Sequence, residues 1–318
     1  MIQKLKPACK DYLWGGTRLR EQYGIQSDKD PLAEAWELSA HPDGESVVSG
    51  GPCDGITFSA YMEKGGRGVL GTHAEAFAKF PVLIKFIDAK NPLSIQVHPS
   101  DEYALRVEGE YGKTEMWYVM DCEEGAFLYF GVNREVSKEE FRRRIEENTV
   151  TEVLNKVPVK KGDVFFIEAG TLHAIGAGIL ICEIQQNSNT TYRVYDYGRR
   201  DAAGNLRELH IEKALDVSRL SPVETGNCEH APKQTGDAEH TLLASCPYFT
   251  TEHYRLAGKT EITAGAESFV SLVILDGEGT VSDRDGAVAF QKGESLFIPA
   301  DSGTVAINGK CEWIQTTI

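Results

Sequence analysis

The feature of this sequence that most constrains its fold is a series of short runs rich in β-branched and aromatic residues. Turns of glycine, proline and aspartate separate these runs along the chain. Such side chains favour strands, and closely spaced short strands favour a barrel or sandwich over a parallel α/β sheet. The sequence therefore predicts a mainly β protein, with strands at residues 81–87, 93–98, 115–120, 126–130, 164–167, 269–275 and 295–299.

One segment in the middle of the chain has a helical pattern instead. Ser137 and Glu140 have the spacing of a capping box, in which the serine caps the helix and the glutamate reaches back. Phe141 and Ile145 then share one face, four residues apart. We interpret the basic triplet 142–144 as a solvated helix face rather than a phosphate site, because acidic neighbours offset its charge. Weaker helical patterns follow Thr57 and Thr72 and occupy residues 211–217.

A polar, turn-rich stretch at residues 221–240 has no periodicity and is typical of a linker. At 318 residues the chain is long enough for two domains. We therefore expect a larger domain over residues 1–225, which includes the helical insert, and a smaller β domain of short strands over residues 240–318.

A faint internal repeat relates these two parts. Residues 162–170 align with residues 293–301, and each copy has a turn glycine, an acidic residue, a four-residue apolar strand and a second turn. His173 follows the first copy, whereas Thr304 stands at the equivalent position of the second. We therefore expect two similar halves, of which only the first carries metal chemistry.

Composition excludes several classes of partner. The net charge of −15 repels nucleic acid and anionic membranes, so we expect neither as a partner. No apolar run approaches the roughly 20 residues that span a bilayer, and the N-terminus lacks the apolar region of a secretory signal. Seven scattered cysteines without a C-x-x-C pair argue against a disulfide framework. We expect a cytoplasmic protein, and its oligomeric state is not predicted.

Three or four side chains have the character of metal ligands. Gln96 and His98 lie two residues apart on a strand pattern and so point to the same face. Glu115 begins the apolar strand after a glycine-containing loop, and His173 follows a turn. In a barrel, ligands from neighbouring strands converge on the interior. Two imidazoles and a carboxylate, with an amide oxygen or water, suit zinc or a similar divalent ion.

Several longer segments carry a resemblance to a known family. They resemble the short bacterial form of the metal-dependent, type I mannose-6-phosphate isomerases, which belong to the cupin superfamily. These segments are DYLWGG at 11–16, AWELS at 35–39, LSIQVHP at 93–99, GKTEMWY at 112–118 and GTLHA at 170–174. The resemblance implies jelly-roll (double-stranded β-helix) barrels in two cupin-like halves, with a small helical insertion.

The resemblance also implies roles for individual residues. It implies one Zn2+ per chain, with the matching ligands Gln96, His98, Glu115 and His173. Arg193 matches the catalytic arginine of the family, and the substrate pocket is matched by Ser94, Lys113 and Glu183. The residues themselves support part of this, because Ser94 alternates with Gln96 and His98, and Lys113 lies two residues before Glu115.

The activity implied is the interconversion of mannose 6-phosphate and fructose 6-phosphate through a zinc-stabilised enediol, with a small sugar phosphate as the partner. The general base stays open among Glu183, His98 and a metal-bound water, and phosphate binding is assigned to Lys113, Arg193 and further basic residues. Two alternatives remain: a cupin oxygenase that uses Fe(II), and a non-catalytic cupin that binds a sugar. The presence of Lys113 and Arg193 beside the ligands favours catalysis.

Overall fold

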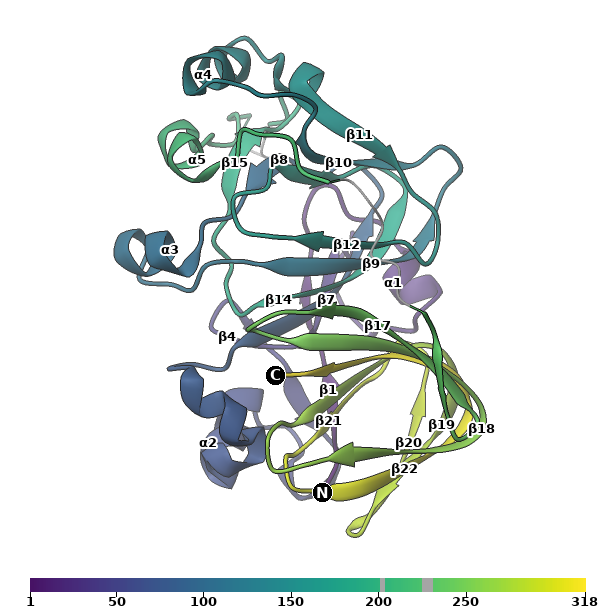
Figure 1. Ribbon diagram of the computed structural model, residues 1–318. Coiled ribbons are helices and arrows are strands. Elements are labelled where there is room, and N and C mark those ends of the chain that lie inside the picture. The colour runs from purple at the N-terminus through teal and green to yellow at the C-terminus, as the bar shows by residue number, and fades with distance from the viewer. Residues whose placement is uncertain (201–203, 225–230) are drawn as a thin grey trace. The chain divides into compact units, whose positions relative to one another are not determined.

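The structure is a computed structural model that describes residues 1–200, 204–224 and 231–318. The chain forms two compact units, shown as ribbons in Figure 1. The terminal unit holds both chain ends and consists of residues 1–12, 17–87 and 231–318. The central unit consists of residues 13–16, 88–200 and 204–224.

A large antiparallel sheet dominates the terminal unit. Its order is β16 (Lys233–Thr235), β17 (Ala238–Ser245), β18 (Thr250–Ala264), β22 (Gly303–Thr317), β19 (Val270–Asp283), β21 (Ser295–Ile298), β1 (Gln3–Lys6) and β6 (Val47–Ser49), with β20 (Gly286–Gln291) paired to β19. Further pairs join β3 (Glu34–Leu38) to β2 (Ala8–Lys10) and β7 (Val82–Ala89), and β4 (Ala40–His41) to β5 (Gly44–Glu45). The helices are α1 (Arg18–Glu21), α2 (Phe58–Gly65), η1 (Gly51–Cys53), η2 (Arg67–Leu70) and η3 (Thr72–Ala76).

Three strands of this sheet are much longer than the short strands expected after residue 240. β18 and β22 each have 15 residues and β19 has 14. The mid-strand glycines, which look like turn residues in the sequence, pair across the sheet instead: Gly309 lies opposite both Gly258 and Gly279. A Cβ on Gly309 would lie 2.4 Å from the carbonyl oxygen of Glu278, so the strands approach too closely there for a side chain.

The expected linker is also shorter than predicted. β16 begins at Lys233 and β17 at Ala238, both inside the stretch 221–240, while residues 225–230 lie outside the described part of the chain. The division into compact units differs from the expected boundary as well, because residues 1–12 and 17–87 cluster with the C-terminal strands. Pairing of β1 with β21, such as Gln3 with Phe297, accounts for this, since two ends of the chain share one sheet.

The central unit is built from two groups of strands. One sheet has the order β11 (Leu154–Pro158), β10 (Phe127–Val132), β13 (His173–Ile175), β8 (Ile95–Val97) and β15 (Tyr192–Tyr195). In the other group, β9 (Glu115–Cys122) lies between β12 (Val164–Ile167) and β14 (Ile179–Gln186). The helices are α3 (Asp101–Val107), α4 (Lys138–Glu146), α5 (Ile211–Val217) and η4 (Val150–Val153).

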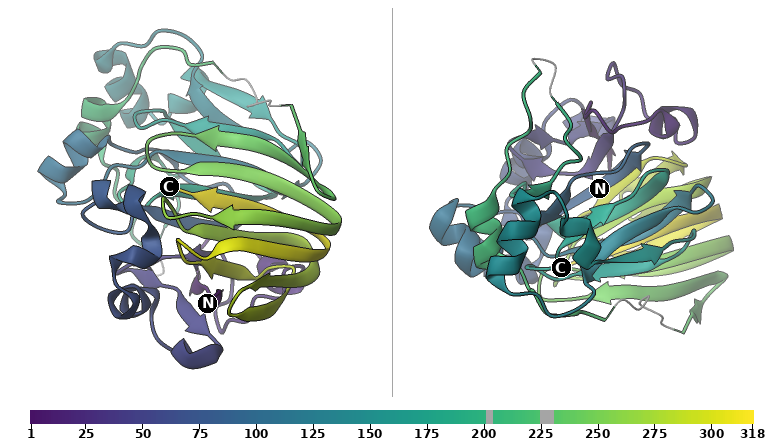
Figure 2. Two further views of the ribbon diagram at one scale, coloured as in Figure 1. Left: turned by 60° about the horizontal axis from the view of Figure 1, so that its bottom comes forward. Right: turned by 90° about the horizontal axis from the view of Figure 1, so that it is seen from above.

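Helices α4 and α5 cover one face of the five-stranded sheet (Figures 1 and 2). Their buried side chains belong to one apolar cluster with the outward-facing residues of three strands: Phe141, Ile145, Ala214, Leu215, Ile95, Val97, Ala174, Tyr192 and Val194. Because side chains alternate along a strand, the intervening residues Gln96, His173 and Arg193 point to the opposite face. The packing of two helices therefore selects which side chains face the second group of strands.

The helical predictions hold in part. Ser137 caps α4 by accepting a hydrogen bond from the backbone N–H of Glu140 at 3.1 Å. The carboxylate of Glu140 does not reach back, because Arg134 and Arg144 bind it. The predicted patterns after Thr57 and at residues 211–217 are α-helices, but the pattern near Thr72 is only a 3-10 helix that begins at Thr72 itself. Helix α3 was not predicted, because Ala104 is its single buried residue and no apolar stripe marks it.

The internal repeat has a structural counterpart. Gly162 and Gly293 both have positive φ, 91° and 83°, and each precedes a four-residue strand, β12 or β21. Glycine favours this backbone conformation because it has no Cβ. The two copies therefore share their local backbone, one in each unit.

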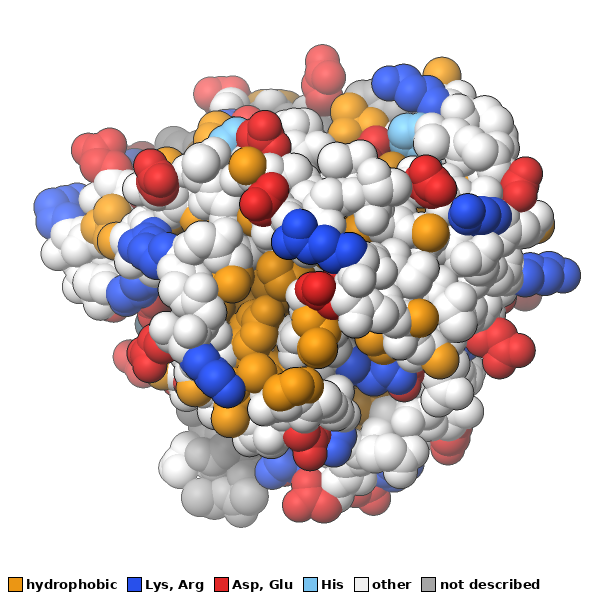
Figure 3. Space-filling model, turned by 90° about the horizontal axis from the view of Figure 1, so that it is seen from below, with side chains coloured by type: hydrophobic (Ala, Val, Ile, Leu, Met, Phe, Trp, Pro, Cys, Tyr) orange, Lys and Arg blue, Asp and Glu red, His pale blue; other side chains and the backbone are white. Residues whose placement is uncertain are grey.

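The surface and the helices give two further observations. In the part of the chain that is described, no helix has both the length and the apolarity needed to cross a membrane. Figure 3 shows one face, on which basic and acidic side chains are interspersed around a group of hydrophobic ones. The net charge of −15 is therefore not gathered into a single acidic patch on that face.

Candidate metal centre

Two histidines of the central unit direct their Nε2 atoms to one point. His98 follows β8 and His173 begins β13, and both side chains are at most 1% exposed. Their Nδ1 atoms lie 2.8 Å from the carbonyl oxygens of Thr190 and Thr171. Because a carbonyl oxygen only accepts, both Nδ1 atoms carry the proton, and both Nε2 atoms present lone pairs. This outer hydrogen bond is the usual support of a metal-binding imidazole.

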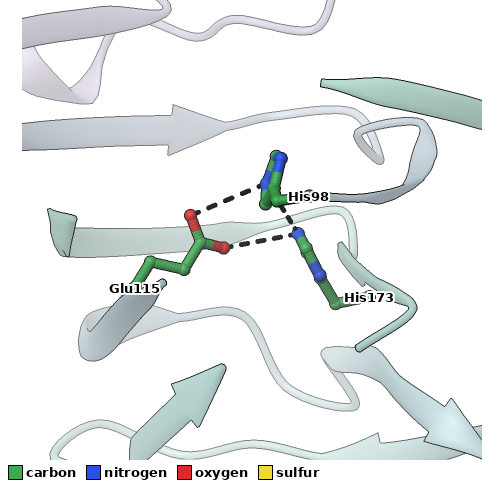
Figure 4. Close-up of side chains that lie close together, drawn as sticks. All are labelled: His98, Glu115 and His173. Carbon is green, nitrogen blue, oxygen red and sulfur yellow. Dashed lines mark hydrogen bonds and ion pairs between the residues drawn. The ribbon is translucent and has the colours of Figure 1, made fainter. Parts of the chain in front are cut away.

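Glu115 completes a cluster with these imidazoles (Figure 4). It begins β9 in the facing group of strands and is fully buried. Its carboxylate oxygens lie 3.3 Å from Nε2 of His173 and 3.8 Å from Nε2 of His98. The two Nε2 atoms are 3.2 Å apart. The three residues lie close enough together to hold one metal ion between them, so the expected convergence of these side chains is confirmed.

Burial sets the protonation state of the second histidine. Desolvation by burial lowers the pKa of His173 to about 4; the positive charge of Lys113 acts in the same direction, whereas the hydrogen bond to Thr171 and the negative charge of Glu183 oppose it. The imidazole is therefore neutral at neutral pH, which is the form that binds a metal. A cluster of lone pairs and one carboxylate, closed off from water, fits a cation better than it fits any neutral group.

Lys113 places a positive charge inside this cluster. Its ammonium group lies 2.7 Å from Glu115, 3.3 Å from Nε2 of His98 and 3.6 Å from Glu183, and the residue is only 4% exposed. Glu183, on β14, accepts a hydrogen bond from the indole N–H of Trp117 at 2.9 Å. Two of the three predicted pocket residues, Lys113 and Glu183, thus lie beside the candidate ligands, within a network of opposite charges.

Gln96 lies at the edge of the same cluster. Its amide nitrogen is 3.3 Å from Nε2 of His173 and 3.5 Å from Nε2 of His98. His173 and Arg193 are the residues directly opposite Gln96 on the two neighbouring strands. The amide lies beside the imidazoles with its nitrogen toward them, whereas a metal ligand would be its oxygen, so the role of Gln96 as a fourth ligand stays a prediction.

Arg193 belongs to the same row, but among the described residues no hydrogen bond or ion pair joins it to the candidate ligands. In the register of the sheet, Phe130, His173, Gln96 and Arg193 lie side by side on four adjacent strands. The guanidinium group donates to the carbonyl oxygen of Glu208 at 2.9 Å, and its buried Nε has no hydrogen-bond acceptor among the described residues. Burial lowers the pKa of Arg193. Ser94 is 5% exposed and lies two residues before Gln96.

Sequence reasoning gave no role to Trp117, which contacts both sides of the site. Its ring packs edge-on against His173 at 5.4 Å between centroids, and its indole holds Glu183. The sequence did place Trp117 near the site, because it lies two residues after Glu115 on one strand and so shares its face. The carbonyl oxygens of Thr190 and Thr171, which support the two imidazoles, could not be predicted from the sequence, since every residue has a backbone carbonyl.

Fold and site together define a class of protein: a β protein with two jelly-roll-like units and, among the described residues, one candidate metal centre between facing strands. Comparisons with known proteins narrow this class. The description "Phosphomannose isomerase type I, catalytic domain" matches residues 2–126, and "Mannose-6-phosphate isomerase, cupin domain" matches residues 238–318.

Individual relatives cover nearly the whole chain. The mannose-6-phosphate isomerase ManA of Bacillus subtilis is 38% identical over 97% of this chain and 96% of its own length. The mannose-6-phosphate isomerase of Streptococcus mutans is 39% identical over 96% of this chain and 94% of its own length. The crystal structure of the mannose 6-phosphate isomerase from Bacillus subtilis matches this structure with a TM-score of 0.92 and 35% sequence identity. The match covers 100% of this chain and 99% of that one. The chain belongs to the type I mannose-6-phosphate isomerases of the cupin superfamily, which confirms the expected fold class and enzyme class.

Proposed function

We propose that this protein interconverts mannose 6-phosphate and fructose 6-phosphate at a zinc site formed by His98, Glu115 and His173, with Gln96 as a fourth ligand. The observation that carries the proposal is the pair of imidazole Nε2 atoms, 3.2 Å apart, each with its own Nδ1 proton directed outward to a carbonyl oxygen. Neither imidazole donates to the other, so both Nε2 lone pairs are available to one cation placed between them.

The donor set favours zinc among the divalent cations. Two imidazole nitrogens and one carboxylate, with positions left for other oxygens, are typical of catalytic zinc. A bound zinc ion would supply positive charge that stabilises negative charge developing on the substrate oxygens. Among the described residues this is the one group of three such side chains that could hold a metal ion. We therefore propose one Zn2+ per chain, with the chemistry in the central unit and a supporting role for the terminal unit.

The chain's own residues divide the remaining tasks. Isomerisation moves a proton between two adjacent carbons through an enediol, so a base must reach that proton. Glu183 is our candidate, because Trp117 orients one of its oxygens while the other lies near Lys113. Lys113 and Arg193 supply fixed positive charge for the enediol and the phosphate group, in a site where burial weakens screening. Ser94 completes the pocket wall.

The test is a coupled isomerase assay on mannose 6-phosphate, run with the purified protein before and after chelator treatment. We expect turnover, its loss on chelation, its recovery with added zinc, and about one zinc per chain by metal analysis. Full turnover by metal-free protein would overturn the zinc site. Turnover of neither sugar phosphate by zinc-loaded protein would overturn the activity, and oxygen consumption with bound iron would favour the oxygenase.

A further inference from the structure

The backbone of Arg193 is held from the open edge of its sheet by a single residue, His210. The Arg193 N–H donates to Nδ1 of His210 at 3.0 Å, and the His210 N–H donates to the Arg193 carbonyl oxygen at 2.8 Å. The same short segment also accepts from the guanidinium group, through the carbonyl oxygen of Glu208. Three hydrogen bonds from residues 208–210 therefore fix both the backbone and the side chain of Arg193.

These hydrogen bonds decide which way Arg193 faces. β15 is the last strand of its sheet, so its outer edge depends on partners from outside the sheet. Since the N–H and C=O of a strand residue point to the same side, both polar groups of Arg193 point away from β8. Arg193 thus forms a non-hydrogen-bonded pair with Gln96, the kind of pair in which opposing side chains lie closest.

The hydrogen bond to Nδ1 requires one protonation state of His210. A backbone N–H only donates, so Nδ1 is the unprotonated nitrogen and the imidazole is neutral. Burial is the main cause that lowers the pKa of His210, and Arg193 and Lys213 act in the same direction, whereas Glu208 and Glu108 oppose them. Protonation at Nδ1 would remove the acceptor and leave the Arg193 N–H without it.

We propose that His210 is a positioning residue for Arg193: its unprotonated Nδ1 locks the edge strand in the register that turns Arg193 toward the metal site, and its protonation in acid releases that lock. This inference rests on the proposed function, because it assigns Arg193 to the reaction. His210 itself contacts neither Gln96 nor the other candidate ligands in any hydrogen bond or ion pair found among the described residues. It therefore acts through Arg193.

His210 also stands at the N-cap position of α5, where its side chain makes no capping hydrogen bond, and two substitutions separate this position from its role as acceptor. His210→Ser keeps a residue that caps helices well but is too short to reach the Arg193 N–H. His210→Asn also caps well and places an oxygen near the position of Nδ1, and it does not titrate. Glu212→Gln is the matched control on the first turn of α5, where it removes only an exposed pair with Arg142.

We expect His210→Ser to lower kcat about tenfold while zinc content and KM change little, because a partly buried N–H donor loses its acceptor. Hydrogen–deuterium exchange of the peptide containing residues 192–196 should quicken. His210→Asn should restore kcat to within about threefold and flatten the acid limb of the pH profile below the ordinary histidine pKa of about 6.5. Glu212→Gln should match the parent in both measurements.

Equal kcat and equal exchange in the parent and His210→Ser would overturn the proposal. So would a parent-like acid limb in His210→Asn, since that variant has no titrating group at this position. The proposed function fails differently, through an inactive parent enzyme. In that case the role in catalysis falls with it, and the exchange rates still decide whether His210 holds the edge strand.

Discussion

The two copies of the internal repeat have the same local backbone and opposite uses. In the central unit, the segment from Gly162 leads through β12 to His173, which is fully buried in a polar cluster. In the terminal unit, the segment from Gly293 leads through β21 to Thr304, which is exposed. β21 is buried at all four positions, whereas one residue of β12 is half-exposed. The same turn-strand-turn segment thus contributes to a candidate metal site in one unit and to an apolar core in the other.

The difference teaches that the repeat itself does not make the site. His173 becomes a candidate ligand because β8 and β9 bring Gln96, His98 and Glu115 to the same point. The terminal unit has no corresponding group of three ligand side chains among its described residues. Convergence from neighbouring strands is what separates the two copies, and it can be tested one copy at a time.

The largest expected effect is on the ligands of the central copy. His173→Ala and Glu115→Gln should each release the metal and lower kcat/KM by on the order of a thousandfold or more, because charge stabilisation by a metal contributes several kcal/mol. The equivalent change in the other copy, Thr304→Ala, should leave metal content and activity unchanged. Metal analysis, the coupled assay and far-ultraviolet circular dichroism measure the metal content, activity and fold of the three variants. Loss of activity in Thr304→Ala would break it.

The next effect concerns Arg193. Arg193→Ala should lower kcat by about a hundredfold to a thousandfold while metal content stays at its parent value, as expected for a group that stabilises charge in the transition state. Arg142→Ala is the control, because Arg142 is exposed on α4 and pairs with Glu212. A rise in KM with kcat unchanged would instead identify Arg193 as an anchor for the phosphate group.

Phe297 and Phe166 occupy equivalent positions in the two copies, and their substitution compares apolar packing. Phe297 is fully buried, with the rings of Phe58, Phe269 and Tyr61 at 4.9, 5.1 and 6.0 Å between centroids. We expect Phe297→Ala to reduce the free energy of unfolding by about 3–5 kcal/mol. Phe166 is half-buried, so Phe166→Ala should cost clearly less. Denaturant unfolding measures both, and equal losses would contradict the inferred difference in packing.

The sequence predicts the site better than it predicts the scaffold around it, and the reason is physical. Gln96 and His98 alternate on one strand, so their common face follows from the period of two alone. Glu115 and His173 have residue types that are costly to bury without a partner, so their positions next to apolar strand residues already mark them in the sequence. Where Arg193 points could not be read in this way, because His210 holds it from a segment with no strand or helix pattern of its own.

The scaffold was harder to predict because its signals are ambiguous. Glycine marks turns in most sequences, yet Gly258, Gly279 and Gly309 lie within long strands where neighbouring backbones approach closely. The pairing of β1 with β21 joins residues nearly 300 positions apart, and the local sequence of neither strand indicates which strand it pairs with. Local residue patterns therefore predicted strands and candidate ligands, but not strand lengths or the composition of the two units.

The smallest expected effect compares the buried glutamates of the two units. Glu115 has Lys113 at 2.7 Å, whereas both carboxylate oxygens of Glu37, on β3 of the terminal unit, lack a hydrogen-bond partner among the described residues. Burial raises the pKa of Glu37 well above 4.5, and the negative charge of Glu294 adds to the rise. The folded protein therefore holds this proton more tightly than the unfolded chain does, so stability contributed by the neutral form is lost as pH rises above about 4.5.

Substitution of Glu37 by glutamine removes this pH dependence while keeping the neutral shape. We expect Glu37→Gln to raise the free energy of unfolding by about 1–3 kcal/mol at pH 8 and to leave it nearly unchanged at pH 4. Glu34→Gln on the same strand is the matched control, because Glu34 accepts from the Trp36 indole at 2.6 Å and lies 3.8 Å from Lys85. It should destabilise at pH 8. A Glu37→Gln variant less stable than the parent at pH 8 would show that this carboxyl has a partner, as Glu115 does, and that the two units do not differ in how they bury charge.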